Sequence, residues 1–365
     1  MQSNPVNFLE YLDKSGRPLL SDGGMGTMLN ARGIGFEQCL DALNLTNPDL
    51  VIEIHQAYIE AGAEIIQTNT FGANRYKLDE HELGERVAEI NAAGVEIARR
   101  AARASGKNIL IAGDVGPLGV RLAPYGRVQS SEASRVFHEQ IKALCRAGAD
   151  LLLLETMSDL NEMLEAIITA RKFCTLPIVA SMTFTRDDRT LLGDTPAHVV
   201  KTLHENGADV IGVNCSGGPA QILRILNNMH QTLPEARLSA MPNAGFPEQV
   251  GGRFMYPASP EYFGEYSKAL HEAGACLIGG CCGTTPAHIA EMRRALDEPN
   301  LEERTTGFGI ILDKADIPSL VTEKKSQLSQ KLANGEFVVS VEMDPPRGLS
   351  THKLLAGASL LAESG

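Results

Sequence analysis

Three cysteines in this sequence have the spacing expected of ligands to a single metal ion. Cys215 ends the strand-like run 209–215, and Cys281 and Cys282 end a second run, 276–282. In a parallel α/β barrel the ends of such strands meet at one face, so the three thiols can share a metal. Three thiolates leave one position of a tetrahedral zinc ion open to an incoming ligand, whereas a structural zinc ion has four protein ligands. The pattern therefore predicts a zinc site that binds and activates a ligand.

The other four of the seven cysteines show no such pattern. An odd total in a long chain without a signal peptide argues against a disulfide framework and favours reduced or metal-bound thiols. We expect these four to behave as small, buried apolar side chains: Cys39, Cys145, Cys174 and Cys276.

A repeated phrase indicates how the chain positions the thiols. Four helix-like segments end at a glycine and run directly into an apolar stretch; the glycines are Gly62, Gly148, Gly207 and Gly274. A left-handed glycine is a common end of a helix. A continuous apolar run is typical of a strand buried on both faces. The repeats therefore predict parallel strands connected by helices.

Eight strand-like runs alternate with eight helical patterns. The expected strands are 18–22, 64–69, 108–113, 150–155, 177–184, 209–215, 237–242 and 276–281. The expected helices are 48–61, 84–105, 130–147, 159–173, 195–206, 218–231, 259–273 and 286–297. Eight alternations predict an α/β fold, a (β/α)8 TIM barrel. An open doubly wound sheet is the alternative, but Asp22-Gly-Gly-Met-Gly-Thr27 lacks the spacing of the phosphate-binding glycine fingerprint.

Polar or metal-binding residues follow the apolar runs, where a barrel collects its catalytic groups. They are Asp22, Asn69, Thr70, Asp114, Glu155, Asn214, Cys215, Asn243, Cys281 and Cys282. Asn243 could bind zinc through its amide oxygen until a substrate arrives, or orient its loop. Asp114 could face a second substrate, or be a turn residue bonded to its own backbone.

The composition excludes several classes of partner. A formal net charge of −12 on 365 residues disfavours binding to nucleic acid or to an anionic membrane, which attract basic surfaces. No window approaches the roughly 18 apolar residues of a membrane helix, and residues 1–14 lack a signal-peptide pattern. We therefore expect a cytoplasmic protein.

Residues Asp22–Thr27, Gly212–Cys215 and Gly279–Thr284 together resemble the zinc-dependent homocysteine S-methyltransferase family, which includes the homocysteine module of cobalamin-dependent methionine synthase. The resemblance covers residues 18–297. It implies a methyltransferase in which the three cysteines bind Zn²⁺ and the homocysteine sulfur takes the fourth position. The thiolate then attacks a donor methyl group to give methionine.

The resemblance also implies contacts to homocysteine. Asp22 and Glu155 would bind its ammonium group, and the backbone N–H groups of Gly23 and Gly24 would be open to its carboxylate. The methyl donor stays open between a corrinoid supplied from methyltetrahydrofolate and a sulfonium such as S-methylmethionine. Betaine is disfavoured, since the chain has no Trp for an aromatic cage. The alternatives are a structural or sensory zinc barrel, or a methyltransferase acting on another thiol or a selenol.

The barrel pattern stops near residue 300, and we divide the chain into a barrel over 1–300, a linker over 301–335 and a further unit over 336–365. Val341-Glu-Met-Asp-Pro-Pro346 resembles the first strand of the methylenetetrahydrofolate reductase barrel, with Glu342 in acid catalysis. An edge strand before a proline turn is the alternative. We expect only the start of such a domain here, with FAD bound by its missing part. His81 fits a corrinoid-ligand motif in residues 79–84, but its position between a barrel strand and its helix indicates coincidence.

Overall fold

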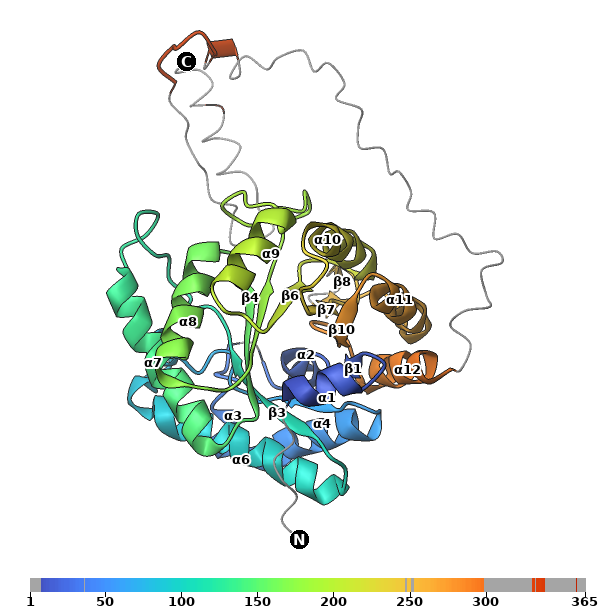
Figure 1. Cartoon of the computed structure of the whole chain (residues 1–365). Coiled ribbons are helices and arrows are strands. Elements are labelled where there is room, and N and C mark those ends of the chain that lie inside the picture. Colours follow the sequence, from blue (N-terminus) through green and yellow to red (C-terminus); the bar gives the residue numbers. More distant parts are fainter. Residues whose placement is uncertain are drawn as a thin grey trace. The chain divides into compact units, whose positions relative to one another are not determined.

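Eight parallel strands form the central sheet (Figure 1). The computed structural model describes residues 8–35, 37–246, 248–250, 253–298, 330–331, 333–338 and 359. The strands are β1 Leu19–Leu20, β2 Ile65–Gln67, β3 Leu110–Val115, β4 Leu151–Met157, β5 Ile178–Met182, β6 Val210–Cys215, β7 Leu238–Pro242 and β10 Ala275–Ile278. Their order is β1-β10-β7-β6-β5-β4-β3-β2, and a parallel bridge from Ser21 to Ile65 joins the two edges. The predicted (β/α)8 barrel is confirmed.

Helices connect the strands where the sequence pattern predicts them. They are α4 Pro48–Glu60, α6 Val87–Ser105, α7 Ser130–Ala147, α8 Leu160–Phe173, α9 Pro196–Glu205, α10 Pro219–Thr232, α11 Pro260–Glu272 and α12 Pro286–Asp297. The four glycines expected to end helices all have left-handed φ values, between 90° and 108°. Each lies between a helix and the next strand, so the local signal is sufficient to set these boundaries.

Two apolar layers stabilise the barrel. In β4, Leu152 and Leu154 pack outward against the helices, whereas Leu151 and Leu153 belong to a cluster inside the barrel. The alternation follows from the two-residue period of a strand. Helix α1, Phe8–Lys14, adds Phe8 to the inner cluster and fills its amino-terminal end. The strand carboxyl ends therefore form the face at which a cavity can open.

Further short elements lie in the loops, and of these only the 3₁₀ helix falls within a predicted helix, 84–105. They are α2 Met25–Ala31, α3 Leu43–Thr46, α5 Arg75–Asp79, the 3₁₀ helix η1 Gly84–Arg86 and the antiparallel pair β8 Glu248–Val250 and β9 Arg253–Met255. All of them lie in connections that follow a barrel strand, on the side where substrates are bound in this fold.

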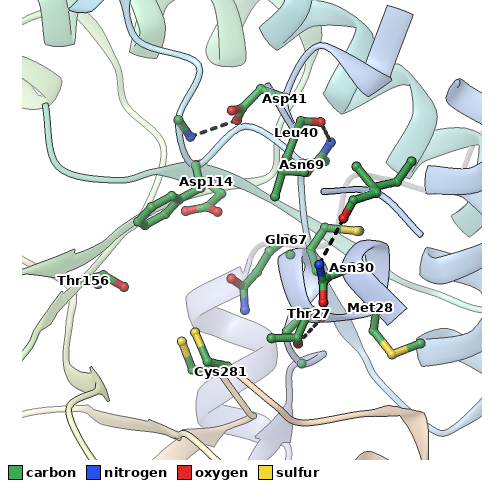
Figure 2. Close-up of a pocket in the computed structure, with 18 of the residues that line it drawn as sticks. Thr27, Met28, Asn30, Leu40, Asp41, Gln67, Asn69, Asp114, Thr156 and Cys281 are labelled. Atoms are coloured by element: carbon green, nitrogen blue, oxygen red, sulfur yellow. Dashed lines mark hydrogen bonds between the residues drawn. The ribbon is translucent and has the colours of Figure 1, made fainter. Parts of the chain in front are cut away.

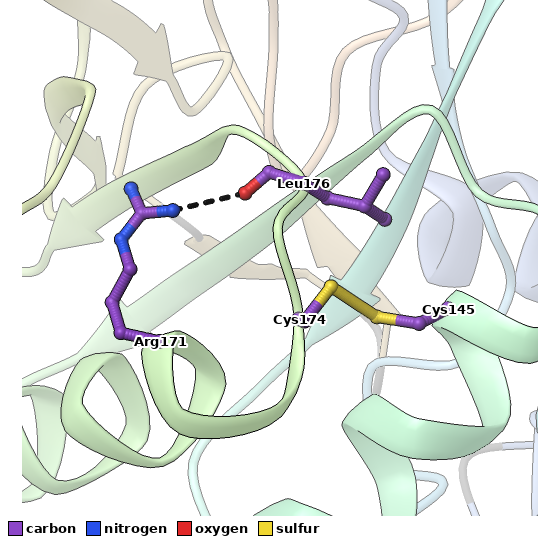
Figure 3. The surroundings of a disulfide bond; sticks show 4 residues. All are labelled: Cys145, Arg171, Cys174 and Leu176. Atoms are coloured by element: carbon purple, nitrogen blue, oxygen red, sulfur yellow. Dashed lines mark hydrogen bonds between the residues drawn. A yellow bond between two sulfur atoms is a disulfide. The ribbon is translucent and has the colours of Figure 1, made fainter.

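The structure contains one disulfide among its described residues, between Cys145 at the end of α7 and Cys174 just after α8 (Figure 3). The expectation that both are small apolar side chains without a partner is wrong. Helices α7 and α8 are neighbours in the barrel, which brings their carboxyl ends together with a Cα–Cα distance of 6.8 Å. A separation of 29 residues carries no local sign of this contact. Cys39 and Cys276 are free and half-buried.

The chain divides into two units, Met1–Leu301 and Glu302–Gly365. The predicted linker and the reductase-like segment with Glu342 lie largely outside the described residues. Within the described part of the chain, no helix combines the length and apolar character needed to cross a membrane.

Candidate active site

The three predicted ligand cysteines come together at the carboxyl ends of β6 and β10. The sulfur atoms of Cys215, Cys281 and Cys282 all lie within 4.8 Å of one another. Cys215 ends β6 with a left-handed φ of 55°, an unfavourable conformation for a residue with a side chain. Strain of this kind is concentrated at functional sites.

The loop after β7 holds the two adjacent cysteines in place. The Cys281 N–H donates to the carbonyl of Pro242 at 2.8 Å, and the Cys282 N–H donates to Asn243 Oδ1 at 3.1 Å. The Ala244 N–H in turn donates to the Cys282 carbonyl at 2.9 Å. Asn243 therefore positions Cys282 through its amide oxygen, the same atom that the sequence analysis offered as a metal ligand.

The chemistry of the cluster fits a soft metal cation. Hydrogen bonds from the thiols of Cys215 and Cys281 lower the pKa of Cys282 to about 3. Cys281 donates hydrogen bonds to both Cys215 and Cys282, and these bonds raise its own pKa. One negative charge is thus shared among three sulfurs. A divalent cation in their midst would stabilise all three as thiolates, the form in which cysteine binds metals.

Two buried carboxyl groups lie in the same cavity as the cysteines. Asp22 follows β1 and accepts hydrogen bonds from the Gln67 N–H at 2.9 Å and the Ser21 hydroxyl at 3.2 Å. Glu155 in β4 accepts from Asn214 Nδ2 at 2.9 Å. Burial raises the pKa of Asp22 to about 7 and that of Glu155 to about 8. Both carboxylates would be stabilised by a cationic group between them.

Asn214 links the carboxyl groups to the cysteines. Besides Glu155, its Nδ2 donates to Thr156 Oγ1 at 2.7 Å and lies 3.9 Å from Cys281 Sγ. Its Oδ1 accepts the Thr156 N–H at 3.0 Å. Because Asn214 immediately precedes Cys215, the end of β6 both holds the Cys215 thiol and orients the Glu155 carboxylate.

The two glycines after Asp22 have different surroundings. The Gly24 N–H donates to Thr284 Oγ1 at 3.1 Å, so the expectation that it is open to a substrate carboxylate is wrong. A Cβ at Gly24 would lie 2.8 Å from the Cys281 carbonyl oxygen, which is why the loop needs glycine here. Among the described residues, no hydrogen bond takes up the Gly23 N–H.

A cavity of about 1370 Å³ connects these groups, as Figure 2 shows in part. One part is lined by Asp22, Glu155 and the cysteines. A second part is lined by α2, by the segment after it and by the loop that follows β2, including Asp41, Phe71 and Lys77. The volume exceeds what one small amino acid needs. The cavity can therefore hold two reactants side by side.

Residues 19–296 match the homocysteine S-methyltransferase family. The chain belongs to this family. The match spans the whole barrel and includes all three cysteines and both carboxyl groups described above.

Individual relatives agree with this assignment. The oxidized form of the homocysteine methyltransferase MmuM from Escherichia coli superposes with a TM-score of 0.67 at 28% identity, over 80% of this chain and 99% of that one. The metallated form gives 0.66. Methionine synthase of Mycobacterium tuberculosis is 33% identical over 311 residues. This chain spans 26% of the length of that methionine synthase and 25% of the Mycobacterium leprae protein.

One contact residue of the homocysteine S-methyltransferase site was missed by the sequence analysis. Tyr256 follows β9 and its pKa is raised by burial, by the negative charge of Cys282 and by a hydrogen bond to that sulfur. The hydroxyl is thus a donor to the cluster from outside the barrel strands. The only indication in the sequence was that Tyr256 belongs to the same loop as Asn243. This does not distinguish Tyr256 from an ordinary surface tyrosine.

Gly283 allows Tyr256 to cover the cysteine loop. Gly283 has a φ of 78°, and a Cβ there would overlap the Tyr256 ring. We expect Gly283→Ala to lower both thermal stability and metal affinity, because backbone strain of ~1–3 kcal/mol adds to this overlap. Metal content and thermal unfolding measure the two effects. Gly106→Ala is the matched control, since Gly106 has a φ of 65° and nothing within 4 Å of the added Cβ. Equal losses in both variants would contradict the role of the ring contact.

Proposed function

We propose that this chain is a zinc-dependent homocysteine S-methyltransferase that transfers a methyl group to the sulfur of homocysteine and forms methionine. The observation that supports this proposal most directly is that the sulfur cluster and the two buried carboxyl groups lie in one cavity. Three thiols can receive a metal that binds a fourth sulfur, and two carboxyl groups can receive an ammonium group. An amino acid with a thiol side chain provides both the fourth sulfur and the ammonium group.

The ligand set favours zinc over other metals. Among the residues that the structure describes, the cluster consists of three cysteines without a fourth Cys, His, Asp or Glu ligand. This set matches catalytic zinc sites, whereas magnesium and calcium prefer oxygen ligands. When bound at Cys215, Cys281 and Cys282, zinc would lower the pKa of the homocysteine thiol so that the thiolate is present at neutral pH. The Escherichia coli relative has a metallated form, which supports the proposal that this chain binds a metal.

The protein side chains would orient the acceptor. Asp22 and Glu155 bind the ammonium group, and the Asn214 amide holds the Glu155 carboxylate in position. The Gly23 N–H is available to the substrate carboxylate. Fixing both ends of the amino acid directs its sulfur toward the cysteines, and this positioning is the main catalytic contribution that the chain can make.

The reaction needs a methyl donor with a good leaving group. The candidates are a corrinoid charged from methyltetrahydrofolate and a sulfonium such as S-methylmethionine. Methionine formation assigns the protein to one-carbon metabolism. We propose a cytoplasmic location, because the three thiols must stay reduced to bind metal, although a disulfide such as Cys145–Cys174 is rare in that compartment.

Zinc-edge X-ray absorption with and without homocysteine tests the proposal. We expect one zinc per chain, with three sulfur neighbours and one oxygen or nitrogen neighbour in the free protein and four sulfur neighbours after homocysteine is added. A coordination shell that does not change would favour the alternative, a structural zinc barrel.

Asn243→Ala separates these alternatives further. In a methyltransferase, this variant should retain zinc and the fourth sulfur, with weaker positioning of Cys282. In a structural site that uses the Asn243 amide as a permanent ligand, the variant should lose both metal and stability.

A further inference from the structure

Asp114 is a buried carboxyl group that the proposed function does not use. It lies near the end of β3, lines the cavity and is only 5% exposed. Its Oδ1 atom is buried and has no hydrogen-bond partner. Across the described part of the chain, no donor reaches its other carboxyl oxygen either. Buried polar groups are almost always hydrogen-bonded, so an unpartnered carboxyl group in a cavity points to a ligand.

The backbone of Asp114 is held firmly although its side chain is not. The Asp114 N–H donates to Thr68 Oγ1 at 3.0 Å, and Thr70 Oγ1 donates to the Asp114 carbonyl at 2.7 Å. The residue also pairs in register with Leu153 of β4. Asp114 is therefore not a turn residue bonded to its own backbone, which was the alternative interpretation of the sequence. The hydrogen bonds that hold Asp114 in β3 involve its backbone, and its carboxyl group takes no part in them.

The charges that line the cavity favour a cationic ligand. Five carboxyl residues line it, Asp22, Asp41, Glu80, Asp114 and Glu155, against a single lysine among the described residues. Burial first, and then the charges of Glu155, Asp41 and Asp22, raise the pKa of Asp114. A cation bound beside Asp114 would lower its pKa again and stabilise the ionised carboxylate.

The lysine offsets the charges around Asp114 only in part, because Lys77 lowers the pKa of Asp114 less than burial and the neighbouring carboxylates raise it. Lys77 Nζ lies over the Phe71 ring, 4.4 Å from its centroid. Within the described residues, Lys77 forms no ion pair with a carboxylate within 4.0 Å. Asp41 is another possible partner of Lys77, and its carboxylate accepts the Gly72 N–H at 2.8 Å. The Asp114 carboxylate is therefore available to a second reactant.

We propose that Asp114 binds the positive charge of a sulfonium methyl donor and determines the specificity for that donor. The inference rests on the proposed function, in which Asp22 and Glu155 already serve the acceptor. Figure 2 shows Asp114 between the Asp41 side of the cavity and Cys281. Of the aromatic residues that line the cavity, Phe71 stacks with Lys77 and Tyr256 contacts Cys282. Neither is free to form the aromatic cage that a quaternary ammonium donor prefers.

The transfer has a clear charge balance. A lone pair of the homocysteine thiolate forms the new bond to the methyl carbon, while the carbon–sulfur bond of the sulfonium breaks and its electron pair returns to the donor sulfur. The products are two neutral thioethers. Because the donor's positive charge is lost during the reaction, Asp114 stabilises the bound donor more than the transition state. Removing the Asp114 charge should therefore raise the donor KM and should not lower kcat.

Steady-state kinetics of Asp114→Asn, with S-methylmethionine as the probe and homocysteine saturating, test the inference. We expect the KM for S-methylmethionine to rise by at least about tenfold, with no fall in kcat. Asp114→Glu should restore most of the affinity. Glu162→Gln is the matched control: Glu162 is an equally buried carboxyl residue that accepts the Leu118 N–H and does not line the cavity. Its donor KM should not change.

The outcomes separate this inference from the proposed function. Homocysteine binding, followed by zinc-edge absorption, should be normal in Asp114→Asn. If homocysteine does not bind even to the unaltered protein, the proposed function fails. If homocysteine binds but the unaltered protein accepts methyl only from methylcob(III)alamin, or Asp114→Asn leaves the donor KM unchanged, the inference is overturned. Should Asp114→Asn not fold, a trimethylsulfonium salt must compete with S-methylmethionine and not with homocysteine in the unaltered protein; absence of this competition also overturns the inference.

Discussion

Cys281→Ser is expected to remove the metal from the protein and to abolish methyl transfer. Cys281 lies within 4.8 Å of the other two sulfurs and donates a hydrogen bond to each of them. Serine supplies a hydroxyl that does not ionise at neutral pH, so a soft cation loses one of three anionic ligands. Loss of residues that only support a metal ligand costs about 10–100-fold in affinity. Loss of a ligand itself should cost more than about 100-fold, which metal titration and the rate of methionine formation will measure.

Cys39→Ser is the control for this prediction. Cys39 lines the same cavity as a free, half-buried thiol but lies outside the three-sulfur cluster. We expect normal metal content and activity in this variant. Full metal occupancy in Cys281→Ser would show that the cluster is not the metal site, whatever the effect on activity.

Glu155→Gln is expected to weaken homocysteine binding by about 30-fold or more, since truncating one partner of a buried charge pair costs 2–5 kcal/mol. The glutamine keeps the size of the side chain but has no charge to offer the ammonium group. Isothermal titration of the zinc-loaded protein with homocysteine measures the effect. Asp114→Asn provides a matched loss of charge elsewhere in the cavity and should bind homocysteine normally.

Because the pKa values of the two carboxyl groups are raised, homocysteine binding should also depend on pH. Without a ligand, Asp22 with a pKa of about 7 and Glu155 with a pKa of about 8 hold protons below these values. An ammonium group favours their ionised forms, so binding must release protons and affinity must fall as the pH drops from 8 to 6. In Glu155→Gln, the proton release below pH 8 should be smaller by the contribution of Glu155, and the release from the homocysteine thiol should remain. A pH-independent affinity in the unaltered protein would exclude these carboxylates as the ammonium site.

The barrel could be predicted from the sequence because its signals are local. A helix ended by Gly62 or Gly148 and followed by a buried run specifies one βα repeat from a few adjacent residues. Eight repeats leave few ways to cover every strand on both faces. The meeting of Cys215 with Cys281 and Cys282 follows from the same topology, because parallel strands bring their carboxyl ends to one face.

Contacts that join distant loops needed the tertiary structure. The occupied Gly24 N–H depends on Thr284, 260 residues away, and the disulfide of Cys145 depends on two helices packing side by side. Tyr256 reaches Cys282 from a hairpin outside the regular repeat. No periodic pattern encodes such pairs, since each depends on how loops fold over the barrel face.

The sequence by itself determined the barrel and the meeting of the three cysteines, since residue type and strand position are enough to specify them. The proposed roles of Asp22 and Glu155 came from the family resemblance. Only the tertiary structure decided which of these groups are already satisfied. Asn214 holds Glu155, whereas Asp114, at the end of a neighbouring strand, is buried without a partner. The physical reason is that hydrogen bonding and desolvation depend on every atom within a few ångströms, and at the mouth of a barrel those atoms come from loops far apart in the chain.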